Sequence, residues 1–111
     1  MVNKYIPSQG DIIWLSFNPT RGHEEAGFRP ALVISRTEYN TRSGMMLCCP
    51  ITSKSKGYKV HIPLTGIAVK GFVLCDQARS IDWYIRKPRF IEKCADETFF
   101  QVTNIIINLI Q

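Results

Sequence analysis

Short apolar segments separated by structure-breaking residues constrain the fold of this chain more than any other feature. They occur through most of the sequence, at 11–17, 30–35, 45–51, 59–64, 71–75 and 79–85. These segments are rich in Ile, Val, Trp and Phe, and several alternate apolar with polar residues, as a half-buried strand does. Pro, Gly and Asn occupy the joints between them, where chains turn. We therefore expect a series of short strands, with one possible helical turn at 37–40.

The C-terminal segment follows a different period. From about 96 to 109 the apolar residues recur at three- and four-residue steps, as on one face of a helix: Phe99, Val102, Ile106 and Leu109. The segment opens with Asp-Glu, which favours a helix N-terminus. Ile105, Ile107 and Ile110 widen the apolar stripe, so we expect part of it to pack on another subunit, with simple core burial as the alternative. Strands followed by one helix predict a mainly β fold, a small half-open barrel with a C-terminal α-helix.

Length and composition are those of a single globular domain covering 1–111. The chain has 45% hydrophobic and 21% charged residues, a balance typical of folded proteins. Its N-terminus lacks the apolar run of a signal peptide. The apolar C-terminal stretch NIIINLI is far shorter than the roughly 18 residues of a membrane span. These features predict a soluble protein that stays in the cytoplasm and has no membrane partner.

The cysteine pattern argues against a metal or cofactor site. Four cysteines are present, with no C-x-x-C spacing among them: Cys48, Cys49, Cys75 and Cys94. Zinc sites and redox pairs use closely spaced cysteines or histidines, so we expect buried, reduced thiols and no cofactor. A nucleophilic cysteine is the alternative, but it needs a histidine partner, and the sequence places neither His23 nor His61 to supply one.

Positive charge is concentrated in the second half of the chain. The net charge is +5, and residues 54–93 hold nine basic but only three acidic side chains. A basic segment on a small domain suggests a polyanionic partner, most often nucleic acid. Ordinary surface lysine is the competing interpretation.

Three segments of the sequence resemble the MazF/PemK family of bacterial toxins. They read GDIIWLSFNPTRGHEEAGFRPALVIS at 10–35, CPITSKSKGY at 49–58 and GFVLCDQARSID at 71–82. The resemblance runs nearly end to end, and the length of the first loop is closest to the MazF branch. It implies an SH3-like barrel with a C-terminal helix that works as a homodimer.

The activity that this resemblance implies is metal-free cleavage of single-stranded RNA at short sequence motifs. In it the ribose 2′-OH attacks the adjacent phosphorus and leaves 2′,3′-cyclic phosphate and 5′-OH ends. Such a reaction needs a base, a stabiliser of charge on the phosphoryl oxygens and an acid, but no nucleophile from the protein. The resemblance also implies a cognate acidic antitoxin of the MazE type that blocks the toxin.

Two residues are expected to act on the scissile phosphate. Arg29 ends the charged loop, and Pro30 restricts its backbone to an extended conformation. A guanidinium there can grip a phosphate through two hydrogen bonds and stays charged throughout. Thr52 follows the third strand, where the resemblance implies a hydroxyl beside Arg29, and Ser53 offers a second donor.

Proton transfer has three candidates, His23, Glu24 and Asp76. His23 has the most suitable intrinsic pKa, whereas a carboxylate beside Arg29 would have its pKa lowered. PemK-type members carry an Arg two residues before the Asp of the Asp-Gln motif, where this chain has Leu74. Arg29 would then have to cover phosphate stabilisation and is a further candidate for proton donation, so the acid and base roles stay unassigned among the four residues.

RNA must also be held, and single strands are usually bound by basic side chains interleaved with aromatic ones. We expect the strand to be bound by Phe17, Ser53, Lys54, Lys56, Tyr58, Gln77, Arg79 and Arg86. Trp14 and Trp83 each alternate with isoleucines, so we assign both to the core.

Two other functions fit the same barrel. A gyrase-poisoning toxin acts through a Trp near the end of its last helix, and this chain has none after Trp83. A non-catalytic nucleic-acid-binding barrel would need the basic segment but not the combination of Glu24, Arg29 and Thr52. Incubation with RNA in EDTA separates these possibilities, because only the ribonuclease would cut.

Overall fold

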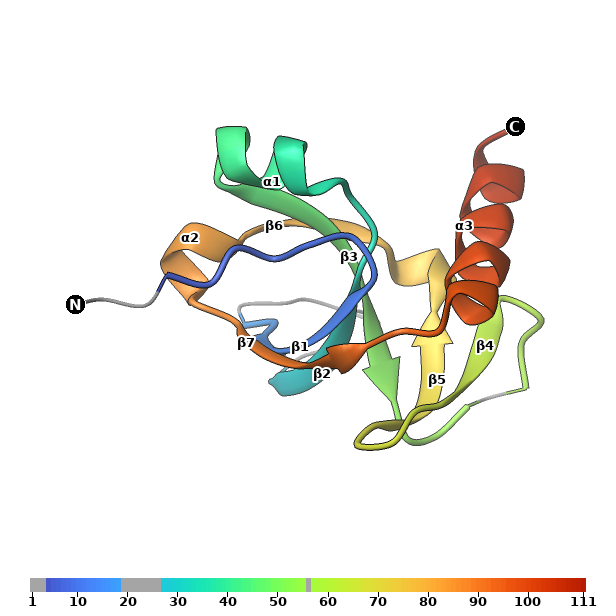
Figure 1. Cartoon of the computed structure of the whole chain (residues 1–111). Coiled ribbons are helices and arrows are strands. Elements are labelled where there is room, and N and C mark those ends of the chain that lie inside the picture. Colours follow the sequence, from blue (N-terminus) through green and yellow to red (C-terminus); the bar gives the residue numbers. More distant parts are fainter. Residues whose placement is uncertain (1–3, 19–26, 56) are drawn as a thin grey trace.

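The computed structural model describes residues 4–18, 27–55 and 57–111 (Figure 1). Within these ranges the strands are β1 (Asp11–Ser16), β2 (Phe28–Val33), β3 (Met45–Thr52), β4 (His61–Thr65), β5 (Lys70–Leu74), β6 (Arg79–Asp82) and β7 (Arg89–Lys93). The helices are α1 (Thr37–Ser43), α2 (Trp83–Arg86) and α3 (Asp96–Ile110), and a single 3-10 turn, η1, covers Cys75–Gln77. None of these helices is long and apolar enough to span a membrane.

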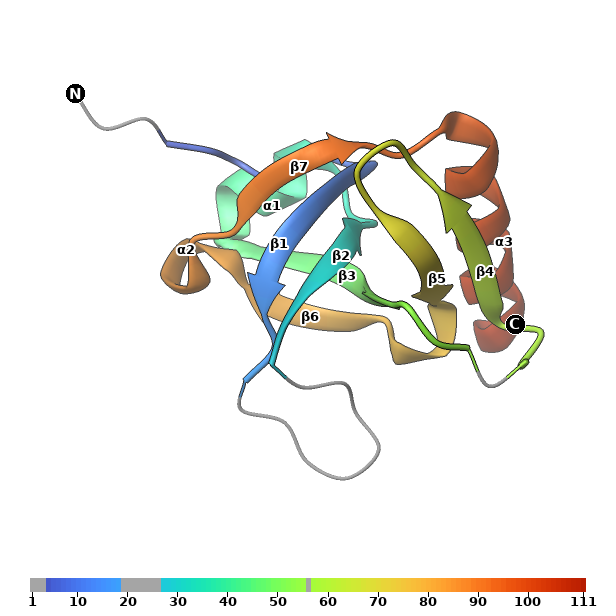
Figure 2. The same cartoon turned by 90° about the horizontal axis from the view of Figure 1, so that it is seen from below.

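The strands form a curled antiparallel sheet (Figure 2). Their order is β4-β5-β3-β2-β1-β7, and β6 pairs with β3 outside this path. β3 therefore joins the two halves of the barrel, since β2, β5 and β6 all pair with it. Helix α3 lies against β4 and η1, away from α1 and α2 (Figures 1 and 2). The predicted mainly β half-open barrel with a C-terminal helix is confirmed.

Two apolar cores lie on the two faces of the central strands. The helix-side core, beneath α3, includes Ile12, Leu32, Cys49, Val73 and Val102. The opposite core includes Ile13, Leu15, Phe17, Val33, Cys48 and Trp83. The split follows from strand geometry, because consecutive side chains point to opposite faces. Each central strand is thus buried on both sides, which explains its nearly continuous apolar sequence.

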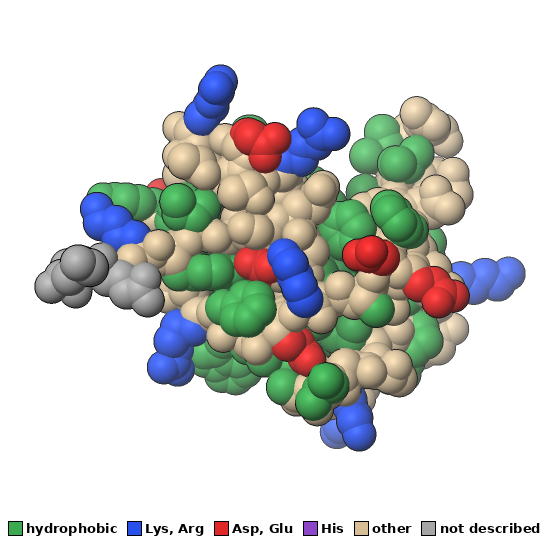
Figure 3. Space-filling view, viewed as in Figure 1, with side chains coloured by type: hydrophobic (Ala, Val, Ile, Leu, Met, Phe, Trp, Pro, Cys, Tyr) green, Lys and Arg blue, Asp and Glu red, His purple; other side chains and the backbone are tan. Residues whose placement is uncertain are grey.

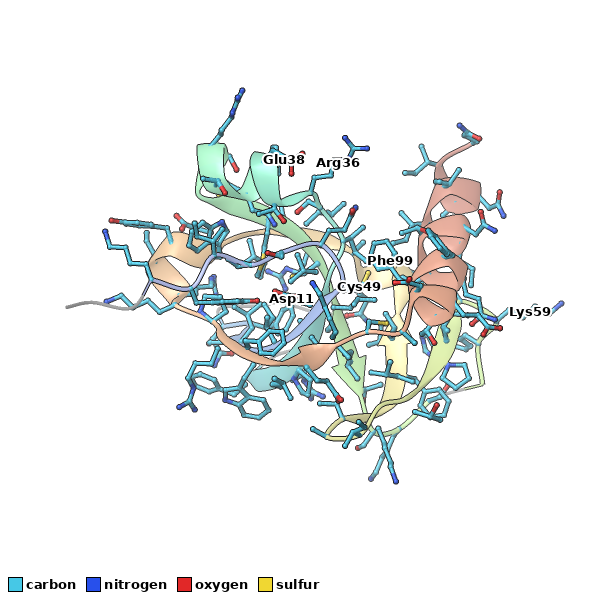
Figure 4. The ribbon with its side chains drawn as sticks, in the orientation of Figure 1. Asp11, Arg36, Glu38, Cys49, Lys59 and Phe99 are labelled. Atoms are coloured by element: carbon cyan, nitrogen blue, oxygen red, sulfur yellow. The ribbon has the colours of Figure 1, made fainter. Side chains whose placement is uncertain are left out.

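Helix α3 begins at Asp96, as the sequence predicted, but its buried face is narrower than expected. Val102 is fully buried, and Phe99 packs on the helix-side core, which includes Cys49 (Figure 4). Leu109, predicted on the same face, is 54% exposed, and so is much of the last turn. The barrel ends before the last helical turn does, so the described part of the chain gives that turn little to pack against.

The predicted strand 79–85 is wrong beyond Asp82. The Asp82 carboxylate accepts a hydrogen bond from the Ile85 backbone N–H at 3.0 Å, which starts the short helix α2. Trp83 is buried as predicted, and its indole N–H donates to the Asn40 carbonyl at 2.9 Å. The alternation of apolar residues was misleading here, because Ile85 points into solvent.

Strand β7 was not predicted, because its sequence is mostly charged. It is an edge strand that pairs only with β1 within the described sheet, a position where charged side chains are tolerated. The Lys93 ammonium lies 2.5 Å from the buried Asp11 carboxylate and ties this edge to β1. The prediction of Trp14 as core is also wrong: it is 36% exposed and stacks on Phe28 with ring centroids 6.2 Å apart.

Candidate functional site

Part of the predicted site falls outside the described residues. His23, Glu24 and Lys56 all lie in the ranges 19–26 and 56. Their predicted roles therefore remain predictions, and the geometry of the site comes from the remaining residues.

Arg29 and Thr52 lie on the paired strands β2 and β3. Ala31 lies opposite Pro50, and this is the last pair of the ladder, so Arg29 and Thr52 each lie two residues beyond it. Past this point β3 pairs with β5 instead. Because side chains alternate along a strand, Arg29 lies on the same face as Ala31, and Thr52 on the same face as Pro50. The two residues expected to act on one phosphate therefore lie near the adjoining ends of two paired strands.

Gly71 supports the other side of Thr52, and sequence reasoning missed it. Thr52 pairs with Phe72 on β5, directly after this glycine. A Cβ at Gly71 would lie 2.4 Å from the Thr52 carbonyl oxygen, and φ there is +155°. Only glycine allows such a close approach of two backbones. The close packing of β5 fixes the backbone from which the Thr52 hydroxyl projects.

Arg79 opens β6 opposite Cys48 of β3. Its guanidinium carbon lies 5.7 Å from the ring centroid of Phe17, and its Nη1 is buried with no hydrogen-bond partner among the described residues. A buried donor without an acceptor is costly. An anionic oxygen is the acceptor that a guanidinium binds most strongly, so this nitrogen is suited to a phosphate.

Arg86 makes hydrogen bonds to backbone carbonyls that the sequence did not suggest. Its Nη1 donates to the Ser16 carbonyl at 2.7 Å and also to the Asn18 carbonyl. The Asn18 side chain in turn accepts a hydrogen bond from the Gly27 backbone N–H at 3.1 Å. Arg86 and Asn18 together hold the two described ends of the first loop.

The two arginines act electrostatically on one buried thiol. Burial raises the pKa of Cys48 to about 12, while the positive charges of Arg79 and Arg86 oppose that rise. Cys48, Pro50 and Thr52 alternate along β3 on the same face. Arg79 and Arg86 are therefore the charged neighbours of Cys48, on the face of β3 that also carries Thr52.

Of the two aromatic residues predicted to contact RNA, one is buried and the other is exposed. Phe17 has no exposed surface, so it cannot stack on a base, and that prediction is wrong. Its ring instead underlies the guanidinium of Arg79. Tyr58 is 55% exposed, and its ring lies 5.1 Å from that of His61, so it is accessible to a base.

Asp76 lies on η1, where its carboxylate is 3.7 Å from His61 Nε2. Its negative charge adds to the effect of burial in raising the pKa of Cys75 to about 11. Asp76 also contributes to the raised pKa of Cys49, after burial and the neighbouring thiols. Asp76 thus acts on the helix-side face of β3. No group of three or more potential metal ligands occurs among the described residues.

The remaining predicted contacts lie near the ends of β3 and η1. Ser53 and Lys54 follow Thr52 and are exposed, and the Lys54 backbone N–H donates to the Thr52 hydroxyl at 3.3 Å. Gln77 follows Asp76 in η1. Figure 3 shows the face viewed in Figure 1, where basic side chains are spread around the rim and acidic ones lie between them. The basic residues are therefore not gathered into one patch on that face.

Comparison with known proteins agrees with this architecture. The family described as PemK-like, MazF-like toxin of type II toxin-antitoxin system matches residues 8–110. The endoribonuclease toxin MazF of Escherichia coli K12 is 49% identical over 86 residues, which cover 78% of each chain.

Solved structures show the same fold. The crystal structure of MazF from Deinococcus radiodurans superimposes with a TM-score of 0.92 at 38% identity, covering 96% of this chain and 98% of that one. A MazE-MazF structure from the same organism gives a TM-score of 0.86 at 38% identity, covering 96% and 97%. With a family match over nearly its whole length, this chain belongs to the PemK/MazF family of toxins of type II toxin–antitoxin systems.

Proposed function

We propose that this endoribonuclease toxin cuts single-stranded mRNA by attack of the ribose 2′-OH on the adjacent phosphorus, without a bound metal. The products carry 2′,3′-cyclic phosphate and 5′-OH ends. The observation that supports this best is that β3, which ends at Thr52, pairs with β2, which carries Arg29, and with β6, which opens with Arg79 and its unsatisfied Nη1. Cleavage of mRNA would place the action of this toxin in the cytoplasm.

Arg29 and Thr52 act on the phosphoryl oxygens in this proposal. Negative charge develops there as the 2′-oxygen attacks, and a fixed guanidinium and hydroxyl would stabilise it more than the ground state. Leu74, at the position of the PemK-type arginine, is 2% exposed and apolar. It supplies no charge or proton, so Arg29 acts without a second cation at that position.

The proton transfers are shared among His23, Glu24 and Asp76, with Arg29 as the alternative proton donor. A base must take the 2′-OH proton, and an acid must protonate the leaving 5′-oxygen. RNA is held around this centre by exposed or unsatisfied groups: Ser53, Lys54, Lys56, Tyr58, Gln77 and Arg79. Arg86 contributes by holding the first loop and by its positive charge.

The test uses the purified protein with a single-stranded RNA oligonucleotide in excess EDTA. We expect cleavage, with ends that carry a cyclic phosphate and a free 5′-OH. A matched oligonucleotide with 2′-deoxyribose on the 5′ side of the cut should not be cleaved. Cleavage of the deoxy substrate would exclude 2′-OH attack, and loss of activity in EDTA would exclude the metal-independent route.

The partner that we propose is an acidic antitoxin, as in the MazE-MazF complexes of Deinococcus radiodurans. An acidic, flexible segment can place carboxylates where phosphates would lie and fold as it binds. We also propose a homodimer, which would cover apolar side chains of α3 that are exposed in this chain: Phe100, Ile107, Leu109 and Ile110.

Competition between antitoxin and RNA tests the shared site. RNA binding to a cleavage-dead Thr52→Ala protein is measured with and without the antitoxin peptide. We expect the peptide to displace RNA, less readily as salt rises. Simultaneous binding without loss of RNA affinity would place the antitoxin elsewhere.

A further inference from the structure

A buried histidine joins the second and third signature segments. His61 is the first residue of β4, and its side chain is only 6% exposed. Its Nδ1 lies 3.1 Å from the Ser55 hydroxyl, and its Nε2 lies 3.7 Å from the Asp76 carboxylate. The tilted ring of Tyr58 lies 5.1 Å from the imidazole. One side chain therefore contacts the segment after β3 on one side and η1 on the other.

Ser55 connects the histidine to the backbone of the same segment. Its oxygen accepts the Gly57 backbone N–H at 3.0 Å and lies within hydrogen-bond distance of His61 Nδ1. A hydroxyl can donate to a ring nitrogen or accept from one, so this contact is compatible with either tautomer of the imidazole. At 3.7 Å the contact of Nε2 with Asp76 is longer than a hydrogen bond, so Ser55 is the better anchor.

Backbone hydrogen bonds join the same segments as the histidine side chain does. The His61 N–H donates to the Tyr58 carbonyl at 3.1 Å, and the Cys75 N–H donates to the Val60 carbonyl at 3.1 Å. Residues 57–60 are thus fastened to β4 and to the start of η1. Tyr58 remains 55% exposed despite these bonds. Its ring is held in one place while one side stays open to solvent.

We propose that His61 is a positioning residue that sets which bases the enzyme prefers, by holding Ser55 and the ring of Tyr58 in one arrangement. The inference rests on the proposed ribonuclease function. A base stacked on an aromatic ring is recognised only if the ring is held in place relative to the cleavage centre. Thr52 lies three residues before Ser55 and nine before His61, so a shift of this segment would move the ring relative to the cleavage centre.

The experiment compares cleavage of a randomised RNA pool, sequenced at the cut ends, by the wild type and by His61→Ala. We expect His61→Ala to keep cutting but to lose about tenfold of its preference for the favoured motif. On one favoured oligonucleotide the loss should appear mainly as a higher KM. His61→Asn can keep a polar atom near the position of Nδ1, so it should restore much of the preference.

Two further variants make the outcome decisive. Ser55→Ala removes the anchor with little change in volume and should shift the motif in the same direction, even if His61→Ala folds poorly. Thr65→Ala, at the exposed far end of β4, should leave both motif and KM unchanged. An unchanged motif in folded His61→Ala or Ser55→Ala would overturn the role of His61. A wild-type protein that cuts no RNA would instead overturn the ribonuclease function itself.

Discussion

Cys48 and Cys49 are neighbours on β3 that face opposite sides of the sheet, and their surroundings differ in charge. Both thiols are buried, and burial raises the pKa of each. Arg79 and Arg86 oppose the rise at Cys48, whereas the neighbouring thiols and Asp76 add to it at Cys49. We call the Cys48 side of β3, near Arg79 and Arg86, the positive face, and the Cys49 side, near Asp76, the negative face.

The difference shows how a small barrel separates two tasks. The positive face ends at Arg29 and Thr52, where a phosphate would be bound and its charge stabilised. The negative face contains η1, where Asp76 and His61 lie beside the segment that bears Tyr58. One strand can serve both because its side chains alternate. Stabilisation of charge on the phosphate and recognition of bases can then be altered separately.

Removal of the Arg29 charge, at the end of the positive face, should have the largest effect on cleavage. We expect Arg29→Ala to lower kcat/KM by about 10²–10³-fold, because a donor to the developing charge is lost. Arg36→Ala is the matched control, since this exposed arginine lies beyond the other end of β2 (Figure 4). Single-turnover cleavage of a favoured oligonucleotide measures both. Activity of Arg29→Ala within tenfold of the wild type would remove Arg29 from catalysis.

Removal of the Thr52 hydroxyl should lower kcat/KM by the same factor or somewhat less. Thr52→Ala loses a neutral donor, whereas Arg29→Ala loses a charged one, and charged hydrogen bonds are the stronger class. Thr52→Ser keeps the hydroxyl and should retain most activity in the same assay. Equal loss in Ala and Ser variants would show that the methyl group, and therefore packing, is what matters at this position.

Removal of the Arg79 charge should have a smaller effect, and on RNA binding. Arg79→Gln removes a cation whose Nη1 lacks an acceptor among the described residues. RNA binding should weaken about equally for all sequences, and the slope of log affinity against log salt should fall by about one. Binding titrations to cleavage-dead protein at several salt concentrations measure this. An unchanged salt slope would mean that Arg79 does not neutralise a phosphate.

The smallest effect concerns the two thiols themselves. Their raised pKa values favour the folded state fully below the ordinary thiol pKa of 9.0. This contribution is lost as the pH rises from there through the higher pKa of the folded protein, because the unfolded chain releases its protons first. Denaturant unfolding from pH 8 to 11 should therefore lose stability more slowly in Cys48→Ala and in Cys49→Ala than in the wild type. A loss as steep as that of the wild type in either variant would show that its thiol does not have a raised pKa in the folded state.

Much of the fold could be predicted because its signals are local. Period-two apolar segments, the residues between them and the three- to four-residue period after Asp96 predicted the barrel and its last helix. Arg29 and Thr52 were found through the family resemblance of their segments. Their positions alone do not mark them as catalytic, because a Thr after a strand or an Arg beside a loop is common in any protein.

Other features depended on which segments meet in three dimensions. The sequence by itself determined a set of strands with two apolar faces, because side-chain alternation and turn residues act over a few positions. Only the tertiary structure decided that Phe17 is buried under Arg79, that Trp14 lies outside the core and that β7 completes the edge. It also decided that His61 meets Ser55 and Asp76. These outcomes depend on contacts between distant segments, which no local pattern of residues encodes.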